Sequence, residues 1–593
     1  MPFNWSSSAS QKIPKELLAT CLGDSLLARL LVNRGVDNAN EAKYYLNPAQ
    51  VEESNSYEIP EMNRAFSRIK EAMVKQEKIV VYGDYDVDGT TSVALLYRAF
   101  NLIGVEIDYY IPSRHTEGYG LNKNALQKFK DEGAALVITC DCGISNFDEV
   151  EFACSIDLDV IITDHHAIPE TPPPSIANCN PKTLPEDHPL HFLPGVGVAY
   201  KLAQLLIFDH FDSIEAKVHC DSLLDLVALG IIADLAPLRA ENRVLAEKGI
   251  AFLANTDKVG LQELLEISGS DNPNTEKIGF GIAPRINAAG RLADAMRAVQ
   301  LMITEDREEA RELVNELNIE NKRRQEICSE IQDEALEMIA EGEDVAKDNC
   351  IALAKEGWHH GVVGIVASRL LDKFHVPVFT MAIEEGITKG SVRCINLPNL
   401  DIYEEMKAIQ GKCGLFMKFG GHKMAAGFSC YKDKTKELIQ AIKDHFSFRL
   451  MGENLLKNVA IDSALKLEEI NEAFYNRIEK LAPYGIEHRQ PVFASGPLTV
   501  KHMKALGNEG KHLKLYLEDP NSKKIIEALL WNRAEDFMDE YGSQVKPSVC
   551  FAYQIKINDF QGERSMQLDI RDWQKPELVP DEIFARFKQK AKV

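Results

Sequence analysis

The chain has 593 residues, of which 45% are hydrophobic and 26% are charged, and its formal net charge at pH 7 is −23. These values are ordinary for a globular protein, and the length predicts three or four domains rather than a single core. The sequence has no apolar run long enough for a membrane span and no apolar stretch of the signal-peptide kind near residue 1. The negative charge argues against nucleic-acid binding but does not exclude it, because a local basic groove is enough to contact phosphates.

The 12 cysteines include no CxxC pair, which argues against a zinc ribbon. In a long chain of this composition they are expected to be reduced thiols, so we predict a cytoplasmic protein with no membrane association. Residues 1–57 are predicted to form a helical N-terminal segment, because "DSLLARLLVNRGV" has the apolar spacing of an amphipathic helix.

Residues 78–92, "KIVVYGDYDVDGTTS", combine a strand pattern with three closely spaced aspartates: Asp84, Asp86 and Asp88. The aspartates resemble the start of an EF-hand loop. An EF-hand requires a carboxylate at position twelve and helices on both sides, whereas position twelve here is Leu95 and a β-branched strand precedes the motif. The sequence therefore predicts a strand, an acidic turn, and then a helix that opens at 89–91 and stops near residue 104.

Two further predicted strands end in residues of the same kind. "AALVITCDCG" ends at Asp141, and "DVIITDHH" ends in Asp164, His165 and His166, with helical patterns at 123–132 and 147–155. Alternating strands and helices of this length predict a parallel sheet. Ligands bind at the carboxyl ends of the strands in such sheets, so all three clusters are expected at one edge.

Each cluster also has a structural explanation. The aspartate triplet could be a solvated turn, Asp141 a helix cap, and the histidine pair part of the core. The predicted convergence of the three clusters on one edge favours a metal site. A fourth carboxylate, Asp234, is embedded in the apolar, helix-like "DLVALGIIADLAPL", where a charge needs a partner unless the residue lies on an exposed face.

The predicted ligand set is rich in oxygen and includes imidazole, which suits Mn²⁺ or Mg²⁺ better than zinc. Four carboxylates, those of Asp86, Asp88, Asp141 and Asp234, would balance the charge of two divalent cations. Paired ions of this kind activate water and stabilise both oxygens of an in-line displacement at phosphorus. The residues therefore predict phosphoester chemistry.

These motifs, in this order, resemble the DHH phosphoesterase superfamily. "IPSRHTEGYGLN", "GFGIAPRINAAGRL", "GWHHGVVGIVASRL" and "FGGHKMAAGFS" are similar to segments of RecJ-type single-strand-specific exonucleases, and "LAPYGIEHRQPVF" and "GKHLKLYL" are similar to their oligonucleotide-binding domain. The resemblance covers about residues 20–573. It implies an α/β fold in which a parallel-sheet DHH domain is joined by a long helix to a second α/β, DHH-associated domain, followed by a β-barrel of the OB fold.

The predicted domain boundaries combine the resemblance with the residue patterns. Thr304–Ala340 has no Gly or Pro and repeats apolar residues at helical spacing, which predicts one long helix, with an interruption near Asn318 as the alternative. The predicted segments are an N-terminal segment at 1–57, a DHH domain at 58–295, a connecting helix at 296–344, a DHH-associated domain at 345–450, an OB-fold domain at 455–573 and a C-terminal tail at 574–593.

The resemblance also implies roles for the acidic edge. Asp86 and Asp141 would hold one ion, and Asp88, Asp141, His165 and Asp234 the other, with Asp84 and Asp164 in or beside these ligand sets. Asp164 is expected to orient an imidazole, and His166 to face the scissile phosphate as a catalytic group.

A pocket for a 5′-phosphate is a further implication. Its candidates are Arg114, Arg285, Ser391 and Arg393, since guanidinium groups suit phosphate oxygens. Relatives usually have Gly between the last two, and here Val392 stands there. The remaining substrate-binding candidates are Asn287, Arg291, His359, Gly421 and His422, the last two in the Gly-rich "GGHKMAAG", which could otherwise be a hinge. Taken singly, each arginine could instead be an ordinary surface residue.

In "GKHLKLYL", alternate residues face opposite sides of the predicted strand. Leu513, Leu515 and Leu517 would face the core, while His512, Lys514 and Tyr516 would form a basic and aromatic face that suits single strands. The alternative is an ordinary half-buried strand.

The sequence thus predicts a metal-dependent 5′→3′ exonuclease that degrades single-stranded DNA to 5′-mononucleotides in DNA repair and recombination. The expected partners are single-stranded DNA with a 5′ end, a single-strand-binding protein and a helicase, and we expect a monomer. One alternative is a phosphodiesterase for short oligonucleotides or cyclic dinucleotides, against which the residues beyond 450 argue. The other is a non-catalytic DNA-binding scaffold, against which the complete set of predicted ligands argues.

Overall fold

The computed structural model describes residues 3–8, 12–114, 116–342, 344–507, 510–542, 544–560 and 563–583. The chain divides into two compact units. Unit 1 comprises Met1–Ile286, Ala295–Val314 and Asn458–Val593, and unit 2 comprises Asn287–Asp294 and Asn315–Lys457. Among the described residues, no helix is both long and apolar enough to span a membrane.

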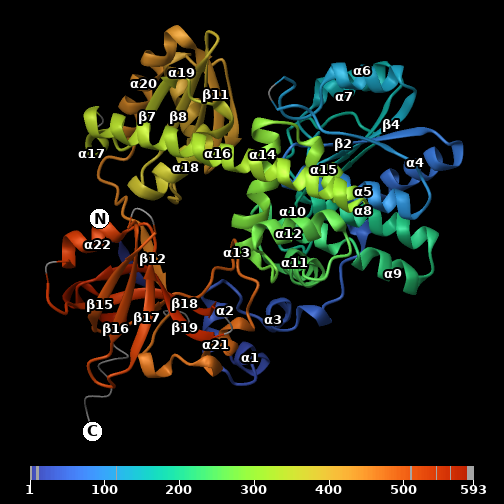
Figure 1. Cartoon of the computed structure of the whole chain (residues 1–593). Coiled ribbons are helices and arrows are strands. Elements are labelled where there is room, and N and C mark those ends of the chain that lie inside the picture. The colour runs from blue at the N-terminus through green and yellow to red at the C-terminus, as the bar shows by residue number, and fades with distance from the viewer. Residues whose placement is uncertain are drawn as a thin grey trace. The chain divides into compact units, whose positions relative to one another are not determined.

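A five-stranded parallel sheet forms the first part of unit 1, with strand order β3-β2-β4-β5-β6. Its apolar strands are buried on both faces, as is usual for parallel sheets covered by helices. Helices α6 and α7 lie on one side of the sheet, and α5 and α8 on the other (Figure 1). The elements are β2 (Lys78–Gly83), α5 (Val87–Leu102), β3 (Asp108–Tyr110), α6 (Lys123–Asp131), β4 (Ala134–Cys140), α7 (Phe147–Ser155), β5 (Asp159–Thr163), β6 (Ala177–Cys179) and α8 (Gly195–His210).

The predicted strands and helices of this sheet are confirmed with small shifts at their ends. Helix α5 begins at Val87, two residues before the predicted start, because the Asp86 side chain caps it by accepting a hydrogen bond from the Gly89 amide. Strand β6 was not expected from the sequence, since it is only three residues long.

Further helices complete this part of unit 1. Helix α10 is buried along its length and packs against α5, α8 and α11. Asp234 is the C-cap of α10 rather than a residue embedded within the helix, so the prediction of its position was wrong. The helices are α4 (Met62–Lys75), α9 (Ser213–Asp221), α10 (Leu224–Ala233), α11 (Ala240–Leu253), α12 (Val259–Ser268), α13 (Thr275–Lys277), α14 (Ala283–Leu292) and α15 (Met296–Ile303), with a π-helical turn at Ile278–Ile282. Helix α14 is divided between the units, because its residues from Asn287 onward belong to unit 2.

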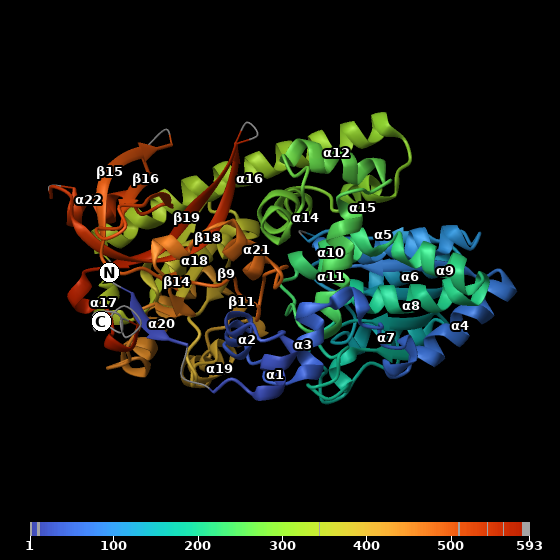
Figure 2. The ribbon, with the colours of Figure 1, turned by 90° about the horizontal axis from the view of Figure 1, so that it is seen from below.

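The C-terminal part of unit 1 is a β-barrel (Figure 2). Strands β15, β16, β17, β19 and β18 pair in a closed ring, because β18 pairs with both β15 and β19. The strands are β12 (Asn458–Ile461), β13 (Ser463–Ala464), β14 (Phe493–Ala494), β15 (Leu498–Leu506), β16 (His512–Glu518), β17 (Ile525–Leu530), β18 (Ser548–Phe560) and β19 (Glu563–Gln574), and the helices are α21 (Glu472–Glu479) and α22 (Ala534–Tyr541). A closed ring of five strands is the architecture of an OB fold.

The N-terminal segment was predicted to be helical, but it begins with a strand and continues with helices. Strand β1 (Asn4–Ser7) pairs in parallel with β12, and Trp5 Nε1 donates a hydrogen bond to Asp572 Oδ2 at 2.8 Å. The following helices share an apolar core with the barrel: α1 (Lys15–Thr20), α2 (Ser25–Val32) and α3 (Ala39–Leu46). The predicted tail at 574–593 starts at the last residue of β19, and its residues 584–593 lie outside the described part of the chain.

Unit 2 contains a five-stranded mixed sheet with strand order β10-β11-β9-β8-β7. Helices α19 and α20 share one apolar core with the sheet, and α16 and α18 share another. The elements are α16 (Arg307–Gly342), α17 (Val345–Asp348), β7 (Ile351–Glu356), α18 (His360–Phe374), β8 (Val378–Glu384), β9 (Ile387–Arg393), α19 (Ile402–Cys413), β10 (Lys418–His422), β11 (Ala425–Tyr431) and α20 (Thr435–Arg449).

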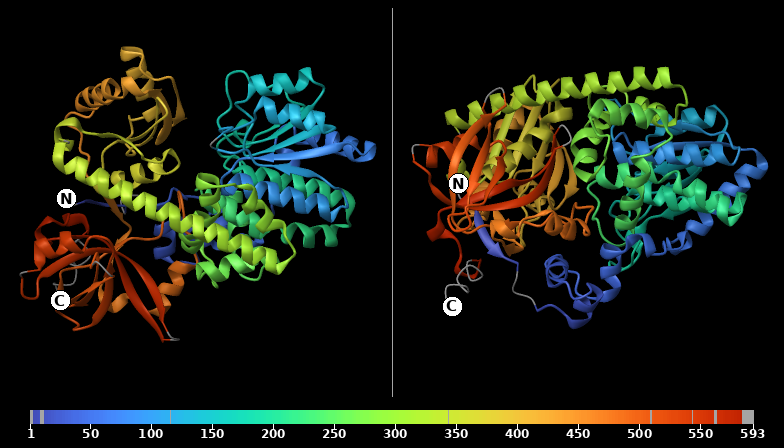
Figure 3. Two further views of the ribbon diagram at one scale, coloured as in Figure 1. Left: turned by 45° about the horizontal axis from the view of Figure 1, so that its top comes forward. Right: turned by 60° about the horizontal axis from the view of Figure 1, so that its bottom comes forward.

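The long helix predicted from the sequence is present as α16, which is continuous through Asn318 (Figure 3). It begins at Arg307, three residues later than predicted, because Asp306 Oδ1 accepts hydrogen bonds from the amides of Glu308 and Glu309. At about 1.5 Å per residue its 36 residues extend about 54 Å. Residues before Asn315 belong to unit 1 and the others to unit 2, so α16 joins the two units.

Candidate metal centre

The acidic clusters at the ends of β2, β4 and β5 converge, as the parallel sheet requires. Three groups of side chains have ligand atoms within 4.8 Å of one another, and they share members: Asp84, Asp86 and Asp141; Asp88, His165 and Asp234; and Asp141, His165 and His166. The structure therefore brings together all the residues that the sequence predicted as metal ligands.

His165 lies at the centre of one group. Its Nε2 is 3.0 Å from Asp141 Oδ1, 3.7 Å from Asp88 Oδ2 and 4.0 Å from Asp234 Oδ2. Asp141 has a φ of 60°, in the left-handed region that only a few non-glycine residues adopt. Asp141 is the first residue after β4, so this left-handed conformation turns the chain immediately after the strand ends.

Asp88 is held in place by the start of α8. Its Oδ2 accepts a hydrogen bond from the Gly195 amide at 2.7 Å, and its Oδ1 accepts one from the Val196 amide at 2.8 Å. A Cβ at Gly195 would lie 2.5 Å from Asp141 Cβ, and a Cβ at Gly230 would lie 2.9 Å from Asp88 Oδ1. Glycine at both positions is therefore a packing requirement of the site, and neither was singled out from the sequence.

The carboxylates crowd one another in a buried place. Burial, reinforced by the Asp86 charge, raises the pKa of Asp84 well above its usual value and the pKa of Asp88 to about 7. Burial and the charge of Asp88 likewise raise the pKa of Asp141 and of Asp234. Asp84 Oδ1 is buried without a hydrogen-bond partner among the described residues.

This arrangement fits divalent cations. Clustered carboxylates with raised pKa values and a buried, unsatisfied oxygen are stabilised when a cation neutralises them. The set consists of carboxylate oxygens and imidazole nitrogens, which suits Mn²⁺ or Mg²⁺.

Asp164 has a different environment from the other aspartates. Its Oδ1 accepts hydrogen bonds from the amides of His165 and His166 and lies 2.7 Å from His166 Nδ1, and its Oδ2 accepts one from the Ile144 amide. Although burial acts to raise the pKa of Asp164, the hydrogen bond from His166 and the charge of that ring lower it. Asp164 therefore orients His166 through Oδ1, while its Oδ2 is held by the Ile144 amide.

Tyr119, which was not predicted as a site residue, lies beside His166. Its hydroxyl lies 3.2 Å from His166 Nδ1 and 3.4 Å from the Asp141 carbonyl, to which it donates. Burial raises the pKa of this hydroxyl, so it stays protonated. In the sequence, the place of Tyr119 in the same motif as Arg114 is the feature that could have identified it as a site residue.

The predicted arginines of unit 1 lie in two places. The Arg114 Cζ atom lies over the Tyr85 ring, 5.0 Å from its centroid, and the arginine charge acts to lower the pKa of Asp84. Arg114 is therefore at the metal centre. Arg285 donates hydrogen bonds to the carbonyls of Gly281 and Ile267.

The remaining phosphate-binding candidates lie in unit 2. Arg393 donates a hydrogen bond to Ser391 Oγ at 2.8 Å, and a Cβ at Gly364 in α18 would be 3.1 Å from Arg393 Nη2. Ser391, Val392 and Arg393 are the last three residues of strand β9. Val392 is buried in the core on the opposite face, so alternation places Ser391 and Arg393 together on the α18 side.

The Gly-rich motif is a hairpin rather than a hinge. Gly421 pairs with Ala426 and His422 with Ala425, and Ala425 in turn pairs with Arg393. Gly421 has a φ of 156°, and a Cβ there would lie 2.4 Å from the Ala425 carbonyl oxygen.

Three other candidates lie in the short segment of unit 2 before α16 or at the start of α18. Arg291 donates a hydrogen bond to the Gly361 carbonyl at 3.0 Å, and His359 caps α18 by accepting from the Gly361 amide. Asn287 is half-buried on α14.

On the barrel, the predicted alternation of β16 is confirmed. Leu513, Leu515 and Leu517 are buried in the core, and His512, Lys514 and Tyr516 are half-buried on the outer face. Lys514 is paired with Glu527 at 2.7 Å and lies over the Tyr516 ring. The lysine charge is therefore partly neutralised on this face.

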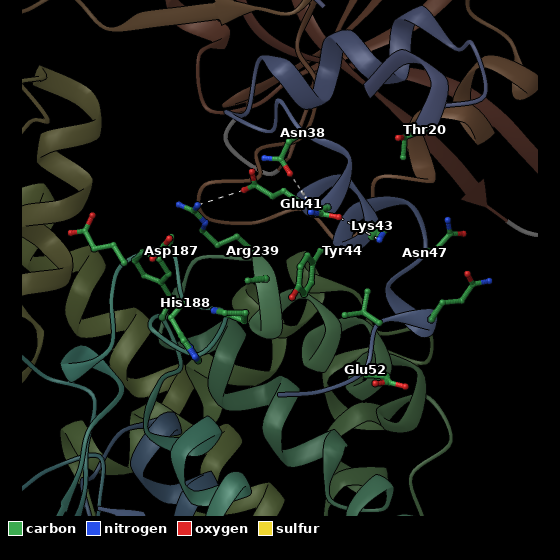
Figure 4. A pocket seen from close by; sticks show the side chains of 17 residues that line it. Thr20, Asn38, Glu41, Lys43, Tyr44, Asn47, Glu52, Asp187, His188 and Arg239 are labelled. Carbon is green, nitrogen blue, oxygen red and sulfur yellow. Dashed lines mark hydrogen bonds and ion pairs between the residues drawn. The ribbon is translucent and has the colours of Figure 1, made fainter. Parts of the chain in front are cut away.

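Unit 1 also has a cavity of about 930 Å³ (Figure 4), and the residues that line it do not include those of the metal centre. Residues 186–189, α3 and the start of α11 contribute to its wall. Glu41, Glu52, Glu186 and Asp187 line it, and Arg239, the strongest base there, is already paired with Glu41 at 3.6 Å. An acidic wall of this kind does not suit a phosphate-bearing substrate.

Three family models match the chain: "DHH family, N-terminal domain" at residues 78–231, "DHHA1 domain" at 347–447 and "RecJ OB domain" at 461–572. The first covers the parallel sheet and most of the metal centre, the second the sheet of unit 2, and the third the barrel. All three segments lie within the domains predicted from the sequence.

Curated relatives match nearly the whole chain. The single-stranded-DNA-specific exonuclease RecJ of Bacillus subtilis is 36% identical over 92% of this chain and 67% of its own length. RecJ of Escherichia coli is 34% identical over 92% of this chain and 95% of its own. The crystal structure of RecJ from Thermus thermophilus in complex with Mn²⁺ has a TM-score of 0.78 and 28% identity, covering 97% of this chain and 80% of that one. The Mg²⁺ complex of the same protein gives a TM-score of 0.73.

Proposed function

The chain belongs to the RecJ family of single-stranded-DNA-specific exonucleases, and from this premise we propose that it degrades single-stranded DNA from the 5′ end and releases 5′-mononucleotides. The exonuclease activity follows from the family, whereas the polarity and the products are our proposal. The observation that carries the catalytic assignment is the convergence of five aspartates and two histidines at one edge of the sheet of unit 1.

The cofactors are divalent cations, Mn²⁺ or Mg²⁺, as in the solved structures of the Thermus relative. We propose two of them, held by overlapping ligand sets. Asp86 and Asp141, with Asp84 beside them, would hold one, and Asp88, Asp141, His165 and Asp234 the other. Bound there, the cations would activate a water molecule and neutralise charge on the phosphate oxygens.

His166 would then act on the substrate phosphate. Burial acts to lower the pKa of His166, but the hydrogen bond to Asp164 and its charge outweigh burial and raise the pKa to about 9. The ring would therefore carry a proton at neutral pH, and its remaining N–H would stabilise the charge that develops on the phosphate or assist the leaving oxygen. Asp164 would fix the ring through Nδ1, and the Tyr119 hydroxyl lies 3.2 Å from the same nitrogen and 3.4 Å from Nε2.

Binding of the strand would use basic groups of both units. In unit 2, Arg393, Ser391 and His422 occupy one face of the sheet beside the start of α18, where a phosphate could accept charge-assisted hydrogen bonds. In unit 1, Arg114 would contact a phosphate near the cations. Tyr516 and Lys514 on the barrel would contact more distant nucleotides.

The cellular setting extends the proposal. A role in recombination and repair, a helicase and a single-strand-binding protein as partners, a monomeric state and a cytoplasmic location are all consistent with the family assignment and remain predictions.

Digestion of end-labelled DNA tests the function. Single and double strands labelled at the 5′ or the 3′ end would be incubated with Mn²⁺, with Mg²⁺ or with EDTA. We expect a 5′ label on single strands to be released as a mononucleotide from the first time point, no digestion in EDTA, and little digestion of blunt duplex. Release of 3′-terminal mononucleotides first, or equal digestion of duplex, would contradict the proposal.

A further inference from the structure

A group of arginines in unit 2, apart from the Ser391–Arg393 pair, surrounds a buried thiol. This thiol belongs to Cys328, which is fully buried. The charges of Arg324 on α16, Arg369 on α18 and Arg291 on α14 all act to lower its pKa, against the larger effect of burial. Arg369 donates a hydrogen bond to Gln332 Oε1 at 2.9 Å, which ties α18 to α16.

Arg324 is unusual among these arginines because only 9% of it is exposed. Its Nη2 donates a hydrogen bond to Asn321 Oδ1 at 2.7 Å, while its Nε is buried without a hydrogen-bond partner in the described chain. Asn321 is itself 2% exposed. A charged group with an unsatisfied donor in such a place is energetically unfavourable unless a ligand completes it.

The side chains of the described residues do not balance the charges of Arg324 and Arg369. Among the described residues, neither Arg324 nor Arg369 forms an ion pair with a carboxylate. Cys328 supplies no negative charge, because burial raises the pKa of its thiol. Burial also lowers the pKa of Arg324, and the like charge of Arg369 lowers it further. Two guanidinium groups that repel each other in a partly buried place are stabilised by an anion.

Arg369 lies on a different face of α18 from the Ser391–Arg393 pair, which was predicted to bind a 5′-phosphate. Gly364 of α18 faces Ser391 and Arg393, and Arg369 lies five residues later. At about 100° per residue, Arg369 points about 140° away from Gly364 around the helix axis. The two sets of arginines therefore lie on different faces of α18.

We propose that Arg324 and Arg369, with the amide side chains of Asn321 and Gln332, form a second phosphate-binding site in unit 2. Planar guanidinium groups fit phosphate oxygens through paired charge-assisted hydrogen bonds, and the two amides fix the planes of the two guanidinium groups. The ligand would be a phosphate group, either of the strand being degraded or of the released mononucleotide. This identification of the ligand rests on the proposed function.

Thermal unfolding with inorganic phosphate tests the site without activity. Wild-type protein, Arg324→Gln and Arg369→Gln would be compared in EDTA, with Arg323→Gln as the matched control, since Arg323 is an exposed neighbour paired with Glu320 at 4.0 Å. We expect phosphate to raise the Tm of the wild type and of Arg323→Gln, and to raise it less in the other two variants. Without phosphate, Arg324→Gln should melt at or above the wild-type temperature, because an uncompensated charge has been removed. An undiminished phosphate-dependent shift in both Arg324→Gln and Arg369→Gln would overturn the proposal, whatever their Tm without phosphate.

Binding assays then identify the source of the phosphate. If the strand supplies it, both variants should bind single-stranded DNA in EDTA about tenfold or more weakly, and the slope of log K against log salt should fall by about 0.7 for one lost contact. If the product supplies it, strand affinity should be unchanged and inhibition by 5′-mononucleotide should weaken instead. If wild-type protein digests single strands and the variants alter neither quantity, the site is wrong. Failure of the wild type to digest single strands would contradict the proposed function instead.

Discussion

The metal centre of unit 1 and the Arg324–Arg369 group of unit 2 carry opposite charges, but each holds like charges close together and includes a buried polar atom without a hydrogen-bond partner among the described residues. At the metal centre, buried aspartates raise one another's pKa values, and Asp84 Oδ1 lacks a hydrogen-bond partner among the described residues. In unit 2, Arg324 and Arg369 lie near each other without a carboxylate, and Arg324 Nε lacks a hydrogen-bond partner among the same residues.

The difference shows how an acidic protein can degrade a polyanion. The net charge of −23 opposes DNA binding only on average, because the groups that would contact phosphate are concentrated in particular places. Each region is less stable alone than with its ligand: cations would stabilise the first and phosphates the second. Loss of a charge should therefore remove ligand binding at either region without destabilising the unliganded protein.

The largest expected effect is at the metal centre. Asp141→Asn keeps the shape of the side chain, and asparagine tolerates the φ of 60° at this position. We expect kcat to fall by at least about 10²–10³-fold, as for loss of a group that stabilises the transition state. Asp157→Asn is the matched control, since Asp157 has a φ of 54° but is exposed outside the site. Steady-state kinetics on a single strand measure both, and near wild-type turnover by Asp141→Asn would show that the ligand assignment is wrong.

A smaller loss is expected on the binding side. Arg393→Ala should lower kcat/KM on 5′-phosphorylated single strands by about ten- to a hundredfold, the value of one charge-assisted contact. The advantage of that substrate over its 5′-hydroxyl equivalent should shrink as well. Lys436→Ala on α20 controls for the loss of one exposed positive charge from unit 2. Equal slowing of both substrates would assign Arg393 to general backbone binding rather than to the 5′ end.

The barrel should contribute less than either region. Tyr516→Ala is expected to weaken binding to long single strands by about fivefold, near the lower end for a stacked base, because the neighbouring Lys514 is already paired with Glu527. Cleavage of tetranucleotides should not change. Filter binding with strands of increasing length measures this, and a loss of the same size on the shortest strand would place Tyr516 nearer the metal centre than we propose.

The smallest effect is on stability as a function of pH. The pKa of Asp88 is raised to about 7, so the stability that this group contributes to metal-free protein is complete near pH 4 and is lost as the pH rises through 7. We therefore expect the Tm in EDTA to fall between pH 5 and pH 8. Mn²⁺ should raise the Tm more at pH 8 than at pH 5. A Tm in EDTA that rises over this interval in the wild type, and equally in Asp88→Asn, would contradict the electrostatic account.

The convergence of the acidic clusters could be predicted from the sequence because strand ends and parallel connections determine where those side chains lie. Ile79–Tyr82 and the two later strands carry their aspartates to one edge whatever the details of packing. The position of Asp234 was predicted less well, since a helix C-cap depends on where the chain leaves the helix. The amides of Gly195 and Val196 could not have been identified, because they contact Asp88 across more than 100 residues through the packing of α8.

Other features were hidden for similar reasons. Strand β1 pairs with β12 across most of the chain length, and no local pattern records a partner at that distance. Arg324 has the ordinary sequence context of a helix surface, and only the packing around it shows that it is buried and without a carboxylate.

The most direct test of the account separates the two regions by their ligands. Titration calorimetry would measure Mn²⁺ binding, and fluorescence anisotropy in EDTA would measure single-strand binding, for the wild type, Asp141→Asn and Arg393→Ala. The account predicts that Asp141→Asn loses Mn²⁺ affinity and keeps or gains strand affinity, whereas Arg393→Ala keeps Mn²⁺ affinity and loses strand affinity. Wild-type Mn²⁺ affinity in Asp141→Asn, or an equal loss of Mn²⁺ affinity in Arg393→Ala, would contradict it.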